Sequence, residues 1–64
     1  MPIVRVTMHS GRTPAQKAEL ARAITEAVVR IAHTTAEATT VIFEDVPKEN
    51  WATGGTLSSQ PHSA

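Results

Sequence analysis

The chain has 64 residues and no cysteine, and its six Lys plus Arg balance six Asp plus Glu, giving a formal net charge of zero at pH 7. Disulfides are therefore excluded, and no net field would attract nucleic acid or an anionic membrane surface. A chain of this size forms one small domain whose own core is marginal, so we expect oligomerisation to supply further stability.

Metal binding and membrane insertion are both disfavoured by the sequence. His9, His33 and His62 lie far apart and lack the paired spacing of structural zinc ligands. No apolar run approaches the roughly 20 residues of a membrane-spanning helix, and Arg5 and Thr7 interrupt the N-terminal segment, which argues against a signal peptide. We expect no metal and no membrane partner, and we place the protein in the cytoplasm.

The first expected element is a strand over residues 3–9, because side chains of different character alternate along it. One face carries Val4, Val6 and Met8, and the other carries Ile3, Arg5, Thr7 and His9. Ser10 and Gly11 then predict a turn.

The second element is a helix from Pro14 to about Ala32. Thr13 occupies the capping position, Pro14 the first helical position, and Gln16 stands three residues past the cap, which together favour a helix start. An apolar stripe follows at helical spacing, formed by Leu20, Ile24, Val28 and Ile31. We expect this stripe to pack on a sheet.

A second strand is expected over residues 39–46, after a polar connection in which Thr34 and Glu37 are spaced to cap a short turn. Strand, helix and strand form a βαβ unit with parallel strands, so the fold class is α/β. The helix covers one face of a two-stranded sheet, and the other face needs a partner.

The C-terminal part is expected to form a short hairpin. Gly54 and Gly55 are turn formers after Trp51, and Thr56 and Leu57 supply a hairpin arm. The domain therefore spans residues 1–57, and residues 58–64 form a polar, flexible tail.

Pro2 raises the question of function, because removal of Met1 would leave a secondary amine at the N-terminus; on its own, proline at this position more often reflects processing than catalysis. Three stretches occur in order: Pro2 with the strand PIVRVTM, then GRTPAQKAEL, then NWATGGTL. Together they resemble the small tautomerases of the 4-oxalocrotonate tautomerase family, over residues 2–57. The resemblance implies a βαβ subunit that dimerises through its sheets and assembles into a homohexamer.

The activity that the resemblance implies is isomerisation of enol or keto carboxylates, such as 2-hydroxymuconate or phenylenolpyruvate, without any cofactor and with a role in aromatic catabolism. Pro2 would be the general base, since burial or a nearby cation lowers the pKa of an amine towards neutrality. Arg12 would bind the substrate carboxylate and polarise the carbonyl. Without the resemblance, we would interpret Arg12 as a surface arginine at a turn. Trp51 would form an apolar wall against the proline of a neighbouring subunit, or serve as a core or interface anchor.

Three positions depart from the best-known relatives. Thr40 stands where diacid-specific enzymes carry a second arginine, so binding of a dicarboxylate should weaken in favour of monocarboxylic enols. His9 stands where a dehalogenating branch carries an extra arginine, so it is either a substrate contact or a strand histidine at a subunit interface. Thr53 replaces the glutamate with which that branch activates water.

Two alternatives to the isomerase remain open from the sequence. One is a hydratase or dehalogenase-type lyase, which Thr53 disfavours. The other is a non-catalytic oligomeric module that kept the scaffold while its substrate pocket decayed, an alternative favoured by Thr40 in place of the second arginine. A retained Met1 would also block the amine that catalysis needs.

Overall fold

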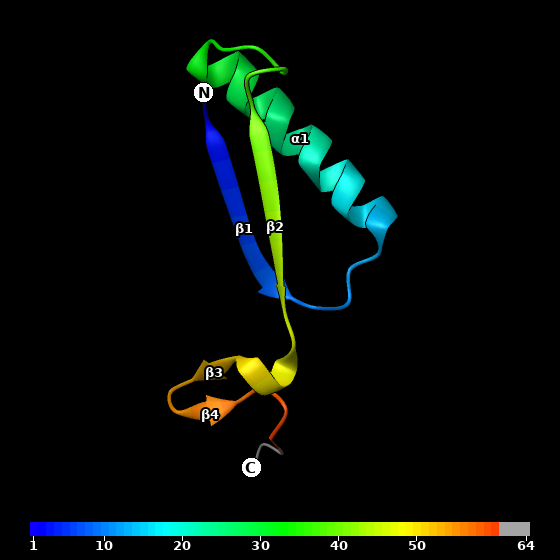
Figure 1. Cartoon of the computed structure of the whole chain (residues 1–64), viewed down its shortest axis with the longest axis vertical. Coiled ribbons are helices and arrows are strands. Elements are labelled where there is room, and N and C mark those ends of the chain that lie inside the picture. Colours follow the sequence, from blue (N-terminus) through cyan, green and yellow to red (C-terminus); the bar gives the residue numbers. More distant parts are fainter. Residues whose placement is uncertain (61–64) are drawn as a thin grey trace.

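The centre of the fold is a sheet of two parallel strands, β1 (Ile3–His9) and β2 (Thr40–Val46), shown in Figure 1. The structure, a computed structural model, describes residues 1–60. Ile3 pairs with Thr40 at one end of the sheet, and His9 pairs with Val46 at the other. The predicted parallel strands are confirmed. Both strands therefore start at one end of the sheet and finish at the other.

Helix α1 (Pro14–Ala32) connects the two strands and begins as the sequence predicted. The Thr13 hydroxyl accepts a hydrogen bond from the Gln16 backbone N–H at 3.1 Å, and the Gln16 side chain accepts one from the Thr13 backbone N–H at 2.9 Å. This capping box satisfies two backbone donors that the helix cannot pair internally. The helix ends at His33, which adopts a left-handed conformation with φ 57°.

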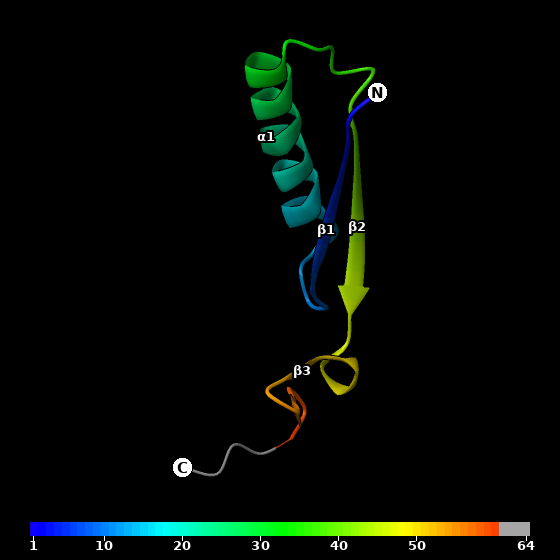
Figure 2. The ribbon, with the colours of Figure 1, turned by 90° about the vertical axis from the view of Figure 1, so that its left-hand side faces the viewer.

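The helix covers one face of the sheet, and Figure 2 shows no described element alongside the strands on the opposite face. Burial alternates along both strands accordingly. The half-buried side chains are those of Val4, Val6, Met8, His9, Val41, Phe43 and Val46. The exposed ones include Ile3, Arg5, Thr7, Thr40, Ile42 and Glu44. Within residues 1–60, one whole face of the sheet thus has no covering element (Figure 2).

No side chain of residues 1–60 is fully buried within one subunit. The predicted apolar stripe is only partly covered: Ile24 and Val28 are half-buried, whereas Leu20 and Ile31 are 38% and 67% exposed. A helix of this length extends for about 28 Å, while strands of seven residues extend for about 20 Å and lie only about 5 Å apart. One narrow sheet is too small to cover the stripe.

The connection between α1 and β2 differs from the prediction. The capping side chain of the short turn is Thr35 rather than Thr34: its hydroxyl accepts from the Ala38 backbone N–H at 3.2 Å. The Thr39 hydroxyl donates to the Thr35 carbonyl at 2.8 Å. The left-handed residue His33 ends the helix and redirects the chain, so the turn begins one residue later than the spacing indicated.

After β2 the chain forms a short helix, η1 (Lys48–Asn50), and an antiparallel hairpin of β3 (Ala52–Thr53) and β4 (Thr56–Leu57). Gly54 and Gly55 make the turn with φ of 61° and 84°, as a two-residue hairpin loop with positive φ at both positions requires. The predicted hairpin is confirmed.

The hairpin projects beyond the end of the sheet, so the subunit is elongated, with a longest extent of 47 Å (Figure 1). Of the tail predicted over residues 58–64, the last four residues lie outside the described part of the chain. Within residues 1–60, no helix has both the length and the apolarity needed to cross a bilayer.

Candidate functional site

Pro2 lies at the start of the sheet, next to the first residue of β2. The Thr40 backbone N–H donates a hydrogen bond to the Pro2 carbonyl at 3.0 Å, which extends the parallel ladder by one residue. Pro2 is half-buried, whereas Met1 is 94% exposed. The residue that covers the proline nitrogen is thus accessible for removal, and its loss would cost the fold no packing.

His9, Trp51 and Ser58 meet at the opposite end of the sheet. The rings of His9 and Trp51 are edge to face, with centroids 4.3 Å apart and an interplanar angle of 64°. The Ser58 Oγ atom lies 3.3 Å from His9 Nε2, and the Ser58 backbone N–H donates to the Trp51 carbonyl at 2.7 Å. All three side chains are half-buried. These contacts bring the C-terminal hairpin onto the last residue of β1.

Arg12 is exposed on the turn between β1 and α1, at the same end of the sheet. Gly11 adopts φ 126°, a conformation that side-chain-bearing residues rarely adopt, so this turn depends on glycine. The Ser10 backbone N–H donates to the Val46 carbonyl at 3.0 Å, which fixes the start of the turn. The capping box at Thr13 fixes its end.

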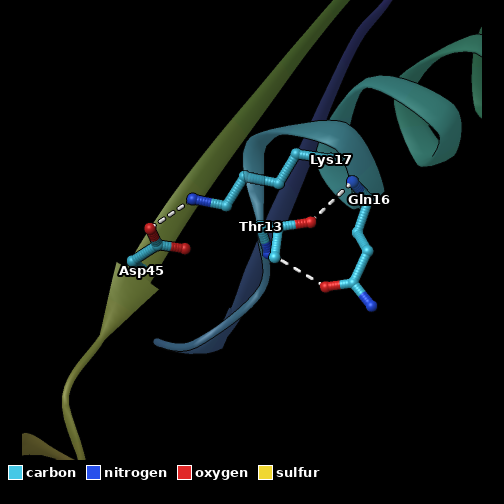
Figure 3. A network of polar contacts seen from close by, with 4 residues as sticks. All are labelled: Thr13, Gln16, Lys17 and Asp45. Atoms are coloured by element: carbon cyan, nitrogen blue, oxygen red, sulfur yellow. Dashed lines mark hydrogen bonds and ion pairs between the residues drawn. The ribbon is translucent and has the colours of Figure 1, made fainter.

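An ion pair adds a further restraint to the helix that follows this turn (Figure 3). The Lys17 ammonium on the first turn of α1 contacts the Asp45 carboxylate near the end of β2. Both side chains are partly exposed, at 26% and 39%, so the pair contributes about 0–1 kcal/mol to stability. The pair links the first turn of α1, which follows the segment that carries Arg12, to the end of β2.

The five residues singled out from the sequence therefore form two separate groups within one subunit. Pro2 and Thr40 lie at the start of the strands, whereas His9, Arg12 and Trp51 lie at or beyond their end. His9 is seven positions after Pro2 along the extended strand, so the two residues lie about 23 Å apart. A substrate held by Arg12 is out of reach of Pro2 of the same subunit.

Ser58 is a contact of this group that sequence reasoning missed. It was assigned to the polar tail, but it touches His9 across 49 positions of sequence. No local pattern predicts such a contact, because it depends on the position of the C-terminal hairpin beside the end of β1. Within residues 1–60, no cluster of three or more potential ligands gathers for a metal ion.

A family model described as "Tautomerase enzyme" matches residues 2–60. The chain belongs to the tautomerase family. A probable tautomerase of Streptococcus thermophilus is 37% identical over 60 residues, which cover 94% of this chain and 98% of the relative. A probable tautomerase of Ralstonia nicotianae is 39% identical over 57 residues, covering 89% and 88% of the two chains.

Solved structures of the tautomerase family have the same fold. A 4-oxalocrotonate tautomerase homologue matches with a TM-score of 0.90 at 36% identity, covering 98% of this chain and 100% of the homologue. TomN, a homologue from the tomaymycin biosynthetic pathway, matches with a TM-score of 0.87 at 40% identity, covering 91% of this chain and 89% of TomN. A heterohexameric 4-oxalocrotonate tautomerase from Chloroflexus aurantiacus matches with a TM-score of 0.89 at 34% identity, covering 97% of this chain and 100% of the relative. The family resemblance inferred from the three sequence stretches is confirmed.

Proposed function

We propose that the protein is a cofactor-independent keto–enol tautomerase for enol or keto carboxylates, with each active site shared between two subunits. The observation that carries this proposal is the position of Pro2 at one end of the sheet and of Arg12 and Trp51 at the other. Antiparallel pairing of β1 with β1 of a second copy places the start of one strand beside the end of the other. Such pairing brings Pro2 of the partner subunit to Arg12 and Trp51.

Two features of the subunit support association with a second copy. Among residues 1–60 the sheet has two strands, so each strand offers an edge unpaired by these residues, and a two-stranded sheet is marginal alone. The uncovered sheet face carries Ile3 and Ile42, which are 59% and 36% exposed. We propose a hexamer built as a trimer of dimers, in line with the heterohexameric relative.

The proposed chemistry uses proton transfer alone. The secondary amine of Pro2 accepts the proton of the enol hydroxyl and returns a proton to the substrate carbon, so the double bond moves and no atom is gained or lost. Arg12 binds the carboxylate and stabilises negative charge on the oxygen, a task that suits a permanently charged planar guanidinium. Trp51 excludes water, and an apolar wall of this kind lowers the pKa of a nearby amine by disfavouring its charged form.

Because of Thr40, a monocarboxylate such as phenylenolpyruvate is a better substrate than the dicarboxylate 2-hydroxymuconate. A neutral hydroxyl cannot replace the charge of an arginine, and a hydrogen bond to a charged group is worth about 1.5–3 kcal/mol. His9 is a further proposed substrate contact. Thr53, exposed in β3, offers no carboxylate to activate water for hydration or dehalogenation.

The deciding experiment follows the ultraviolet absorbance of phenylenolpyruvate and 2-hydroxymuconate during ketonisation by protein whose mass shows that Met1 has been removed. We expect catalysis that is lost in Pro2→Ala and in a preparation that retains Met1. Ketonisation of both enols at the buffer rate would refute the proposal. Chloride release from 3-haloacrylates would then test the lyase, and its absence would leave a non-catalytic module. The cytoplasmic location and the role in aromatic catabolism remain predictions.

A further inference from the structure

The His9 imidazole is held from two sides by the C-terminal segment. The Trp51 ring packs against it at a centroid distance of 4.3 Å, and the Ser58 hydroxyl lies 3.3 Å from its Nε2 atom. Within residues 1–60, no hydrogen bond reaches the second ring nitrogen, Nδ1. One nitrogen is thus committed to Ser58, and the other is available to a ligand.

Ser58 owes its position to backbone hydrogen bonds rather than to His9. Its N–H donates to the Trp51 carbonyl at 2.7 Å, which ties it directly to the residue that carries the indole. The next turn is closed by Gln60, whose side chain accepts from the Leu57 N–H at 2.7 Å and whose N–H donates to the Leu57 carbonyl at 3.1 Å. The indole and the hydroxyl therefore form one preorganised clamp around the imidazole.

The clamp lies at the end of the sheet that presents Arg12. Arg12 is three positions after His9, so their Cα atoms are at most about 11 Å apart. When Arg12 binds the carboxylate of a small substrate, the rest of the substrate lies near the Trp51 indole and the His9 imidazole. An indole favours a flat, unsaturated group by stacking, and an imidazole nitrogen favours an oxygen that can donate or accept a hydrogen bond.

We propose that Ser58 is a positioning residue for His9, and that His9, held in this way beside Trp51, is the specificity-determining contact for an oxygen substituent at the substrate end remote from the carboxylate. The inference rests on the proposed tautomerase function. It assigns the protein to planar, conjugated or aromatic monocarboxylic enols that carry a hydroxyl or carbonyl on that remote end.

The test compares three enols: phenylenolpyruvate, its para-hydroxy derivative and its para-methyl derivative, which has a similar size but no hydrogen-bonding group. We expect kcat/KM of the wild type to be about three- to tenfold higher for the hydroxy than for the methyl compound, which is the worth of one neutral hydrogen bond. Ser58→Ala and His9→Phe should reduce this ratio to about one. Ser58→Thr, which keeps the hydroxyl, should retain the ratio, as should the neighbouring control Ser59→Ala.

The outcomes separate this inference from the proposed function. If the wild type ketonises all three enols but treats the hydroxy and methyl compounds alike, the inference is wrong and the tautomerase stands. If Ser58→Ala slows all three enols by the same factor, Ser58 has only a structural role, and the inference is again overturned. If no enol is ketonised, both fail. Emission of Trp51, the only tryptophan, reports independently whether each variant keeps the clamp folded.

Discussion

The Lys17 ammonium contacts the Asp45 carboxylate and so joins the first turn of α1 to the end of β2 (Figure 3). The contact spans 28 positions of sequence and lies next to the turn that presents Arg12. Together with the capping box at Thr13, it restrains the start of α1, which directly follows the turn that carries Arg12. We therefore predict that the pair contributes to the placement of Arg12.

Replacement of this carboxylate should affect substrate binding. We expect Asp45→Asn to lower the free energy of unfolding by less than about 1 kcal/mol, because the pair is partly exposed. We expect kcat/KM for phenylenolpyruvate to fall about two- to fivefold, since looser placement of Arg12 weakens both carboxylate binding and the stabilisation of negative charge on the oxygen. Steady-state kinetics and urea unfolding at fixed protein concentration measure both effects. Glu19→Gln removes an exposed carboxylate on α1 and is the control. It should change neither the kinetics nor the free energy of unfolding.

The separation of Pro2 from Arg12 predicts complementation between two inactive variants. Pro2→Ala and Arg12→Ala should each lose activity, and a mixture refolded together should regain about a quarter of the wild-type activity if dimers form at random. Half of the dimers are then mixed, and each mixed dimer has one intact site. Activity of the mixture no higher than that of the separate variants would contradict a site shared between subunits.

The hairpin turn predicts that its two glycines respond differently to substitution. Gly55 has φ 84° and Gly54 has φ 61°. Gly55→Ala should destabilise the hairpin by about 1–2 kcal/mol, because side-chain-bearing residues avoid this conformation. Gly54→Asn should be tolerated, since asparagine is common at the first position of such a turn. A changed emission of Trp51 and a lower kcat/KM in Gly55→Ala, but not in Gly54→Asn, would verify the prediction.

Thr40 predicts a change of specificity through a single added charge. Thr40→Arg should raise kcat/KM for 2-hydroxymuconate by about ten- to a hundredfold, the equivalent of a charge-assisted hydrogen bond of 1.5–3 kcal/mol. The rate with phenylenolpyruvate, which has no second carboxylate, serves as the internal control and should change little. An equal change with both enols would show that Thr40 does not face the remote end of the substrate.

Local features of the chain were predictable because local physics produces them. Alternation of side chains predicted β1, and the Thr13 and Gln16 spacing predicted the capped start of α1, since both depend on residues a few positions apart. Gly54 and Gly55 predicted the hairpin because positive φ at both positions favours glycine. The turn before β2 was misplaced by one residue, because a left-handed His33 has no reliable sequence signal.

The sequence by itself determined the elements, their order, the family and the residue types of the candidate site, since these follow from short-range spacing and recognisable motifs. Only the tertiary structure decided where those residues lie. Parallel pairing in register places Pro2 and His9 at opposite ends of the sheet, and the path of the chain through the hairpin places Ser58 against His9. Both relationships depend on the path of the chain between distant residues, which no local pattern specifies.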